Sequence, residues 1–218
     1  MLYDFAQIPA AARYKLLSGC ILPRPIALVS TTDGKGGHNA APYSFFNVMS
    51  HEPALIVLGI DQKRPGTPKD TVGNLRTTGD FVVNLVDMKI AEAMSVCAID
   101  FETGVDEIRE AGLTALPASR VKAPRIAEAP VSLECRLMDE LRYPAGRSIV
   151  VGEVLAFHVR DGIVDERFHV DALALDLVGR MAGAGGYCRL SDPFSIARLT
   201  QDEWRAGKRA TFATVNPS

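Results

Sequence analysis

The sequence predicts a single, mainly β domain in which antiparallel strands close into a barrel and a few helices pack outside it. Three observations support this class: five or more segments have a strand pattern, glycine-containing turns join two pairs of them, and few segments have a helical pattern. Closure is favoured because it leaves no exposed strand edge. The 218 residues, 47% of them hydrophobic, can bury the core of one domain over 1–218.

The first predicted hairpin lies near the N-terminus. Residues 24–33 (RPIALVSTTD) are rich in β-branched residues, and GKGG at 34–37 suits a tight turn. The second arm, HNAAPYSFF, contains Pro42, which cannot donate to a ladder and predicts an edge or bulged strand. Residues 54–61 are almost entirely apolar, which predicts a strand covered on both faces in the middle of the core.

A helix is predicted within KDTVGNLRTTGD, with Asp70 or Thr71 as its N-terminal cap and Gly79 as its end. A second hairpin is predicted around PAGR at 144–147. The remaining predictions are strands at 81–86, 131–143 and 148–160, a helix at 89–101, and an irregular region rich in Pro and Ala at 102–130.

Composition argues against several classes of function. A net charge of −2 and a pI of about 6.1 provide no basic field for nucleic acid. The N-terminus lacks a secretory pattern, and the apolar run at 53–60 is far shorter than the ~20 residues of a membrane helix. Four widely separated cysteines and four histidines without zinc spacing predict free thiols and no metal site. We therefore expect a soluble, cytoplasmic protein.

Five blocks occur in an order that resembles the flavin reductase-like family of FMN-binding split barrels: RPIALVSTTD, NAAPYSFFN, EPALIVLGI, RPGTPKDTVGNL and GDFVVNLV. The resemblance spans about residues 14–190 and leaves 191–218 as a C-terminal extension. It implies a Greek-key-like split β-barrel, a homodimer, and a bound FMN or, less favoured, FAD. It also implies an oxidoreductase that passes hydride from NAD(P)H to flavin, with a flavin-dependent monooxygenase as a candidate partner.

The segment 39–53 (NAAPYSFFNVMSHEP) has the mixed chemistry that a flavin requires. FMN joins a flat ring to a polar chain and a phosphate, so its site needs apolar surface, hydrogen-bonding groups and an anion pocket. Tyr43 and Phe45, with Phe46, could supply the surface, while Ser44 and Asn47 could bond the ribityl chain or the phosphate. The alternative is that the aromatic residues are core residues of a strand and Ser44 faces water.

The segment RPGTPKDT predicts the anion pocket. It places Arg64 and Lys69 beside a helix start at Asp70 and Thr71, where unpaired amides attract anions. The alternative is an ordinary cap flanked by two solvated cations. The resemblance assigns the lysine and the threonine to the flavin phosphate. Asp70 would cap the helix or pair with Arg64 or Lys69. A pocket for a terminal phosphate, without a recognisable adenosine site, predicts FMN over FAD.

Two further regions complete the candidate site. The resemblance places the edge of the flavin ring against the backbone of Ser30 and Thr31. The glycine-rich segment 179–190 could approach a flat ligand closely, and Tyr187 could cover the flavin or nicotinamide; a plain loop is equally compatible. The apolar segment LALDLVGRMAGAGGY is a candidate dimer surface.

The electron donor stays open, because the histidine motif that some family members carry for the nicotinamide is missing here. No side-chain acid or base is identified as catalytic, and no GxSxG or P-loop sequence points to another mechanism. A flavoredoxin-like electron carrier or oxidase, and a flavin-binding module without turnover, are the alternatives.

Overall fold

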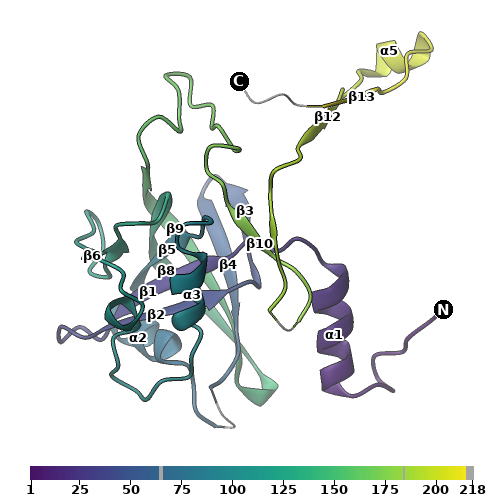
Figure 1. The fold of residues 1–218 in the computed structure, drawn as a ribbon. Helices are drawn as coiled ribbons and strands as arrows, with labels where there is room; N and C mark the ends of the chain where they lie inside the picture. The colour runs from purple at the N-terminus through teal and green to yellow at the C-terminus, as the bar shows by residue number, and fades with distance from the viewer. Residues whose placement is uncertain (64–65, 184, 215–218) are drawn as a thin grey trace.

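The computed structural model describes residues 1–63, 66–183 and 185–214. A seven-stranded antiparallel sheet dominates it, in the order β2-β1-β5-β8-β9-β4-β3 (Figure 1). Its strands are β1 (Ala27–Thr32), β2 (His38–Tyr43), β3 (Phe46–His51), β4 (Ala54–Ile60), β5 (Asp80–Leu85), β8 (Val131–Tyr143) and β9 (Arg147–Val159). The prediction of a mainly β, antiparallel architecture is confirmed.

The first hairpin forms where the sequence predicted it. Gly34 and Gly36 have φ values of 76° and 105° in its turn, where L-residues are disfavoured. β2 is an edge strand, as Pro42 predicted. It is not bulged, because it pairs with β1 in continuous register from Ala27↔Tyr43 to Thr32↔His38. The register shift lies instead in β3, between Val48 and Ser50.

The second hairpin has arms of 13 residues each, β8 and β9. A short 3-10 turn, η1 (Pro144–Gly146), joins them, with Ala145 and Gly146 at positive φ. Two register shifts, after Glu134 and after Leu137, increase the local twist of this ribbon. The long arms let the hairpin pair with β5 on one side and with β4 on the other.

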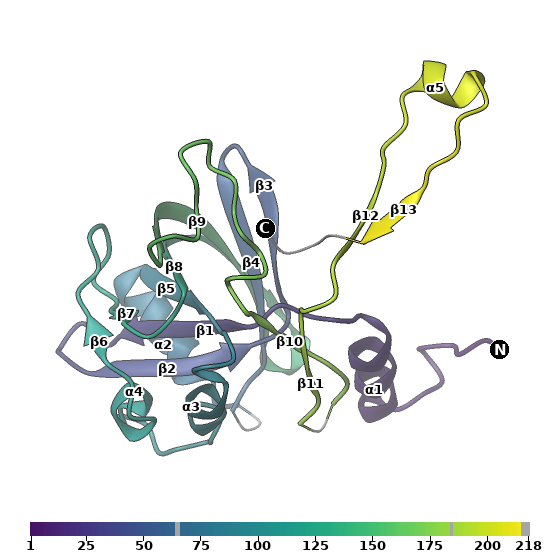
Figure 2. The ribbon, with the colours of Figure 1, turned by 45° about the horizontal axis from the view of Figure 1, so that its top comes forward.

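The sheet is curved but not closed into a barrel. Figure 2 shows β1 and β2 crossing the direction of β3 and β4, and no ladder joins edges β2 and β3 in the described ranges. The expectation of closure is therefore wrong. Only Ser44 and Phe45 separate the two edge strands in sequence, and the strands diverge from this corner. Pro42 on β2 provides no amide that could extend a ladder across the gap.

The main core fills the concave side of the sheet. It contains Phe81, Val83, Ile56, Leu58 and Leu75 among its buried side chains. On β4, buried residues alternate with half-buried ones, and this strand is second from an edge. β4 contributes Ile56 and Leu58 to the core, but the prediction that it is covered on both faces was wrong, because the side chains on its other face are only half-buried.

The helices pack mainly against β1 and β2. Helix α2 (Asp70–Thr78) contacts both strands and ends at Gly79, at φ 74°, as predicted. Helix α3 (Ala91–Val96) is shorter than the predicted 89–101. The region 102–130, predicted to be irregular, contains α4 (Glu107–Glu110) and a small ladder of β6 (Ala115–Leu116) with β7 (Arg125–Ile126).

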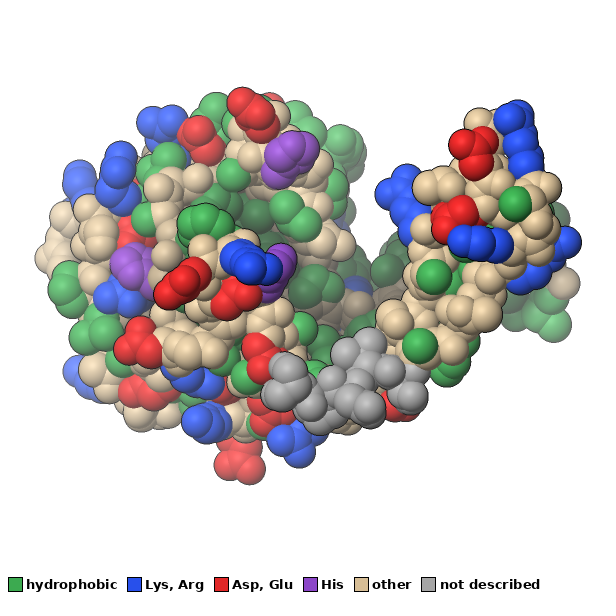
Figure 3. Space-filling view, turned by 90° about the horizontal axis from the view of Figure 1, so that it is seen from above, with side chains coloured by type: hydrophobic (Ala, Val, Ile, Leu, Met, Phe, Trp, Pro, Cys, Tyr) green, Lys and Arg blue, Asp and Glu red, His purple; other side chains and the backbone are tan. Residues whose placement is uncertain are grey.

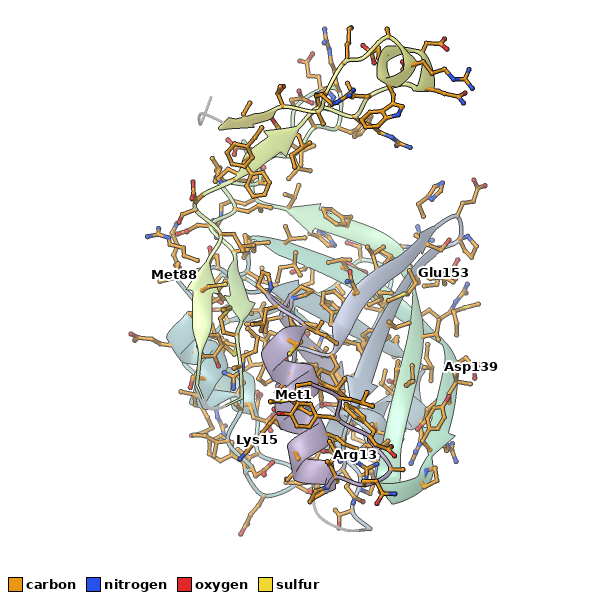
Figure 4. All side chains as sticks on the ribbon, turned by 90° about the vertical axis from the view of Figure 1, so that its right-hand side faces the viewer. Met1, Arg13, Lys15, Met88, Asp139 and Glu153 are labelled. Carbon is orange, nitrogen blue, oxygen red and sulfur yellow. The ribbon has the colours of Figure 1, made fainter. Side chains whose placement is uncertain are left out.

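The two ends of the chain lie outside the sheet. Figure 4 shows α1 (Ala10–Cys20) beside the hairpin of β10 (Val178–Arg180) and β11 (Tyr187–Arg189). An arm of β12 (Phe194–Ile196), α5 (Gln201–Arg205) and β13 (Phe212–Thr214) projects beyond them (Figure 2). In Figure 3 the arm is a separate lobe, divided from the main body by a deep notch.

Candidate functional site

The start of α2 brings together the residues predicted for the anion pocket and the loop 39–53. The Tyr43 hydroxyl donates to Thr71 Oγ1 at 2.9 Å, and Asn39 Nδ2 donates to the same oxygen at 3.1 Å. All three side chains are buried, and burial raises the pKa of Tyr43. Two segments separated by 28 residues thus form one polar cluster.

Lys69 is the N-terminal cap residue of α2, and its side chain makes no capping hydrogen bond. The predicted caps, Asp70 and Thr71, are instead the first two helical residues. A lysine at this position is unfavourable, because the positive end of the helix dipole and the ammonium repel each other. The first turn of α2 therefore combines amides without a side-chain cap and a cation, which together suit an external anion.

The other charged residues near this turn are paired. Asp70 accepts from Lys63 Nζ at 3.3 Å and from the Thr103 hydroxyl at 3.0 Å, so it neither caps the helix nor pairs with Lys69. Lys69 Nζ lies 2.6 Å from Asp100 Oδ1. Arg64, also predicted for the pocket, lies outside the described residues.

A cavity of about 90 Å³ lies between these groups, and Glu107 is among the lining residues that sequence reasoning missed, with Asn39, Lys63 and Asp100. Glu107 is buried and accepts from the Ala40 amide at 3.0 Å. Burial raises the pKa of this carboxyl, although the hydrogen bond from Ala40 opposes the shift. The cavity is smaller than a whole-ligand pocket and matches a small polar group. No motif marks Glu107, because its partner lies 67 residues away.

Ser44 and Phe45 lie beside a buried cation, Arg24. Arg24 Nε donates to Ser44 Oγ at 3.3 Å, and the Arg24 guanidinium lies 6.0 Å from the centroid of the Phe45 ring. These residues border a cavity of about 270 Å³ between α1 and the β2–β3 corner. Ser44 and Phe45 are therefore separated from the Thr71 cluster, although Tyr43 is their neighbour in sequence.

Asn47 borders a cavity of about 560 Å³ that is lined mainly by apolar side chains. Its own side chain is exposed and accepts from the Val48 amide at 2.8 Å. The wall is built by residues of β3, β4, β5, β8, β9 and β10, and includes Phe46, Ile56, Leu133 and Phe157. The volume lies in the range of small-molecule pockets.

Ser30 and Thr31 are fully buried in β1. Ser30 accepts from Asn84 Nδ2 at 3.0 Å and donates to the Pro124 carbonyl, while Thr31 accepts from Asn74 Nδ2 at 2.9 Å. Ser30 pairs with strands on both sides, and Thr31 pairs with β2 alone. Their side chains are thus engaged within the protein, and Thr31 keeps one backbone edge outside the ladder with β5.

Tyr187 lies on the hairpin β10–β11, away from the sheet. It is half exposed, and the Arg180 guanidinium stacks 4.5 Å from its ring centroid. The structure thus joins Tyr43, Lys69 and Thr71 at one cavity, places Ser44 and Phe45 at a second, and leaves Tyr187 on the hairpin.

Within the described ranges, no group of three His, Cys, Asp or Glu side chains is arranged to hold a metal ion. None of the helices there has the length and hydropathy of a membrane span.

Comparison with known proteins shows the family to which the chain belongs. The flavin reductase like domain matches residues 18–178. A protein of Deinococcus radiodurans is 43% identical over 209 residues, which cover 93% of this chain and 92% of that protein.

Solved structures show the same fold. The 2-nitrobenzoate 2-nitroreductase NbaA of Pseudomonas fluorescens is 36% identical, with a TM-score of 0.82 over 92% of this chain and 95% of that one. Component B of the nitrilotriacetate monooxygenase from Bacillus cereus is 29% identical, with a TM-score of 0.85 over 89% of this chain and 98% of that one. By sequence and by fold, this chain belongs to the flavin reductase-like family.

Proposed function

We propose that the protein is an FMN-dependent oxidoreductase of the flavin reductase type, which takes hydride from NAD(P)H. The observation that carries this proposal is the start of α2, where Lys69, the amides of the first turn and the cavity beside Thr71 lie together. A terminal phosphate fits this set, because it would satisfy amides that no side chain caps and would offset the lysine charge.

Different residues would hold different parts of the flavin. Lys69 and the first turn of α2 would hold the phosphate, while Asn39 and Tyr43 would keep the Thr71 hydroxyl in place. Ser44, Phe45 and Asn47, at the neighbouring cavities, remain candidates for the ribityl chain and the ring. Once bound, the flavin supplies a ring that accepts hydride, so no side-chain acid or base is required.

We also propose a homodimer. Large apolar side chains are exposed on α1, on β3 and on the C-terminal arm: Tyr14, Leu17, Val48, Met49, Phe194, Ile196, Trp204 and Phe212. Exposed apolar surface of this extent is unusual on a monomer and is typical of an interface. A second copy would cover it. A monooxygenase partner is supported by the similarity to component B of a monooxygenase.

Absorbance spectra of the purified protein with FMN test the proposed reaction. Bleaching of the flavin band by NADH or NADPH under anaerobic conditions is the expected result, with riboflavin as the phosphate-free control. A flavin that stays oxidised with both nucleotides but bleaches with a reduced protein donor indicates the electron carrier. A flavin that binds yet stays oxidised with every donor indicates a binding module. Tighter binding of FAD than of FMN contradicts the phosphate pocket.

A second candidate function is the reduction of a small aromatic acceptor by the bound flavin. Two observations favour it: the apolar cavity of about 560 Å³ next to Asn47, and the 36% identity to a 2-nitrobenzoate nitroreductase. Turnover of NAD(P)H that depends on added 2-nitrobenzoate, with FMN retained on the protein, supports this candidate. Turnover that depends only on free FMN supports the flavin reductase.

A further inference from the structure

The cation that would receive the flavin phosphate already has an internal partner. Lys69 Nζ lies 2.6 Å from Asp100 Oδ1, and the Asp100 side chain is more than half exposed. Two more contacts hold the same segment, one to Lys63 in the loop before α2 and one to Asp70 in its first turn. The Phe101 carbonyl accepts from Lys63 Nζ, and the Thr103 hydroxyl donates to Asp70 at 3.0 Å. Residues 100–103 are thus held over the start of α2.

The charges around the cavity show why the Lys69–Asp100 pair affects the binding of an anion. The residues that line it include two cations and three carboxylates: Lys63, Lys69, Asp70, Asp100 and Glu107. Asp70 is occupied by Lys63 and Glu107 by the Ala40 amide, so Asp100 is the carboxylate that shares Lys69 with an arriving ligand. A phosphate monoester carries about −1.5 to −2 charges at neutral pH. Its charge repels the Asp100 carboxylate, so the phosphate approaches Lys69 closely at the expense of the Lys69–Asp100 pair.

We infer that Asp100 is an affinity-determining residue that competes with the flavin phosphate for Lys69. This inference rests on the proposed function. Binding of FMN exchanges one ion pair for another, so the net gain from Lys69 is smaller than that of a free lysine. Riboflavin has no phosphate and leaves the Lys69–Asp100 pair intact. Asp100 therefore weakens the binding of phosphorylated flavin selectively, speeds its release, and keeps it exchangeable with a partner.

Asp100→Asn tests the inference, because it keeps the shape of the side chain and removes its charge. From the small free energy of exposed ion pairs, we expect the variant to bind FMN about two- to fivefold more tightly than the wild type at low salt. Quenching of flavin fluorescence measures this affinity. Dissociation of FMN should slow by a similar factor in stopped flow, and riboflavin affinity should not change. Glu166→Gln is the matched control for net charge, since Glu166 is exposed in the turn after β9, and should leave both affinities unchanged.

A double-mutant cycle with Lys69→Ala separates this inference from the proposed function. The gain in FMN affinity from Asp100→Asn should vanish in the Lys69→Ala background, because the lysine for which Asp100 and the phosphate compete is then missing. If Lys69→Ala weakens FMN binding but Asp100→Asn does not strengthen it, competition is refuted and the phosphate site stands. If Lys69→Ala leaves FMN binding unchanged, both the phosphate site and the competition are refuted. Equal tightening of FMN and riboflavin by Asp100→Asn also overturns the inference.

Discussion

Arg24 holds three separate parts of the molecule together, and its removal should be costly. The side chain is almost completely buried. It donates to the Ser18 and Ile21 carbonyls at the C-terminal end of α1, to the Met181 carbonyl in the hairpin β10–β11, and to the Ser44 hydroxyl. A cation at this end of a helix satisfies carbonyls that have no intrahelical partner and complements the helix dipole.

The magnitude follows from the groups that Arg24→Ala would leave behind. The Ser18 bond is buried, whereas the Ile21 and Met181 bonds are only partly buried, so water can replace part of the latter two. A buried acceptor without a partner costs about 1–3 kcal/mol, and the cavity adds to this. We expect Arg24→Ala to lower the free energy of unfolding by about 3 kcal/mol. Arg24→Lys should cost less, because it keeps the charge but loses the planar fork of donors.

Chemical denaturation followed by far-UV circular dichroism measures this loss. Fluorescence of the single tryptophan is unsuitable, because Trp204 is exposed on the C-terminal arm and reports on the arm. Arg13→Ala, in the helix α1 that Arg24 contacts, is the matched control (Figure 4), since the Arg13 side chain is exposed and donates to the Ile8 carbonyl at 3.2 Å. It should change the stability by less than about 0.5 kcal/mol. If Arg24→Ala is as stable as Arg13→Ala, Arg24 does not hold these parts together.

Three further predictions concern the site, the acid stability and the assembly. Lys69→Ala should weaken FMN binding by about 1.5–3 kcal/mol and leave riboflavin binding unchanged in calorimetry; equal losses for both ligands would move the anion pocket elsewhere. Arg76 lowers the pKa of Glu140 to about 2 from 4.5, so this pair stabilises the fold above pH 4.5 and loses its effect as the pH falls toward 2. Glu140→Gln should therefore reduce the loss of stability between pH 5 and 2, measured as the midpoint of urea unfolding at each pH. Light scattering should give the mass of a dimer, and a monomer with bound FMN contradicts the proposed interface.

Much of the fold could be predicted because it depends on local chemistry. The turn at 34–37 needs glycines that tolerate positive φ, the edge position of β2 follows from an amide that Pro42 lacks, and α2 ends where Gly79 adopts the left-handed conformation. Each of these is a property of one residue and its neighbours. Closure of the sheet is different, because it depends on whether two edge strands meet in space, and here they diverge after Ser44.

The candidate site was predictable only in part. The sequence by itself determined which segments carry flavin-like chemistry, and the tertiary structure decided which of them meet. Tyr43 joined Thr71 while the adjacent Ser44 turned to Arg24, because neighbouring residues at the end of a strand face opposite sides. The contacts of Asp100, Glu107 and Arg24 span 31, 67 and 157 residues. No local pattern encodes such pairs, because they form only when the folded core brings distant segments within hydrogen-bonding distance.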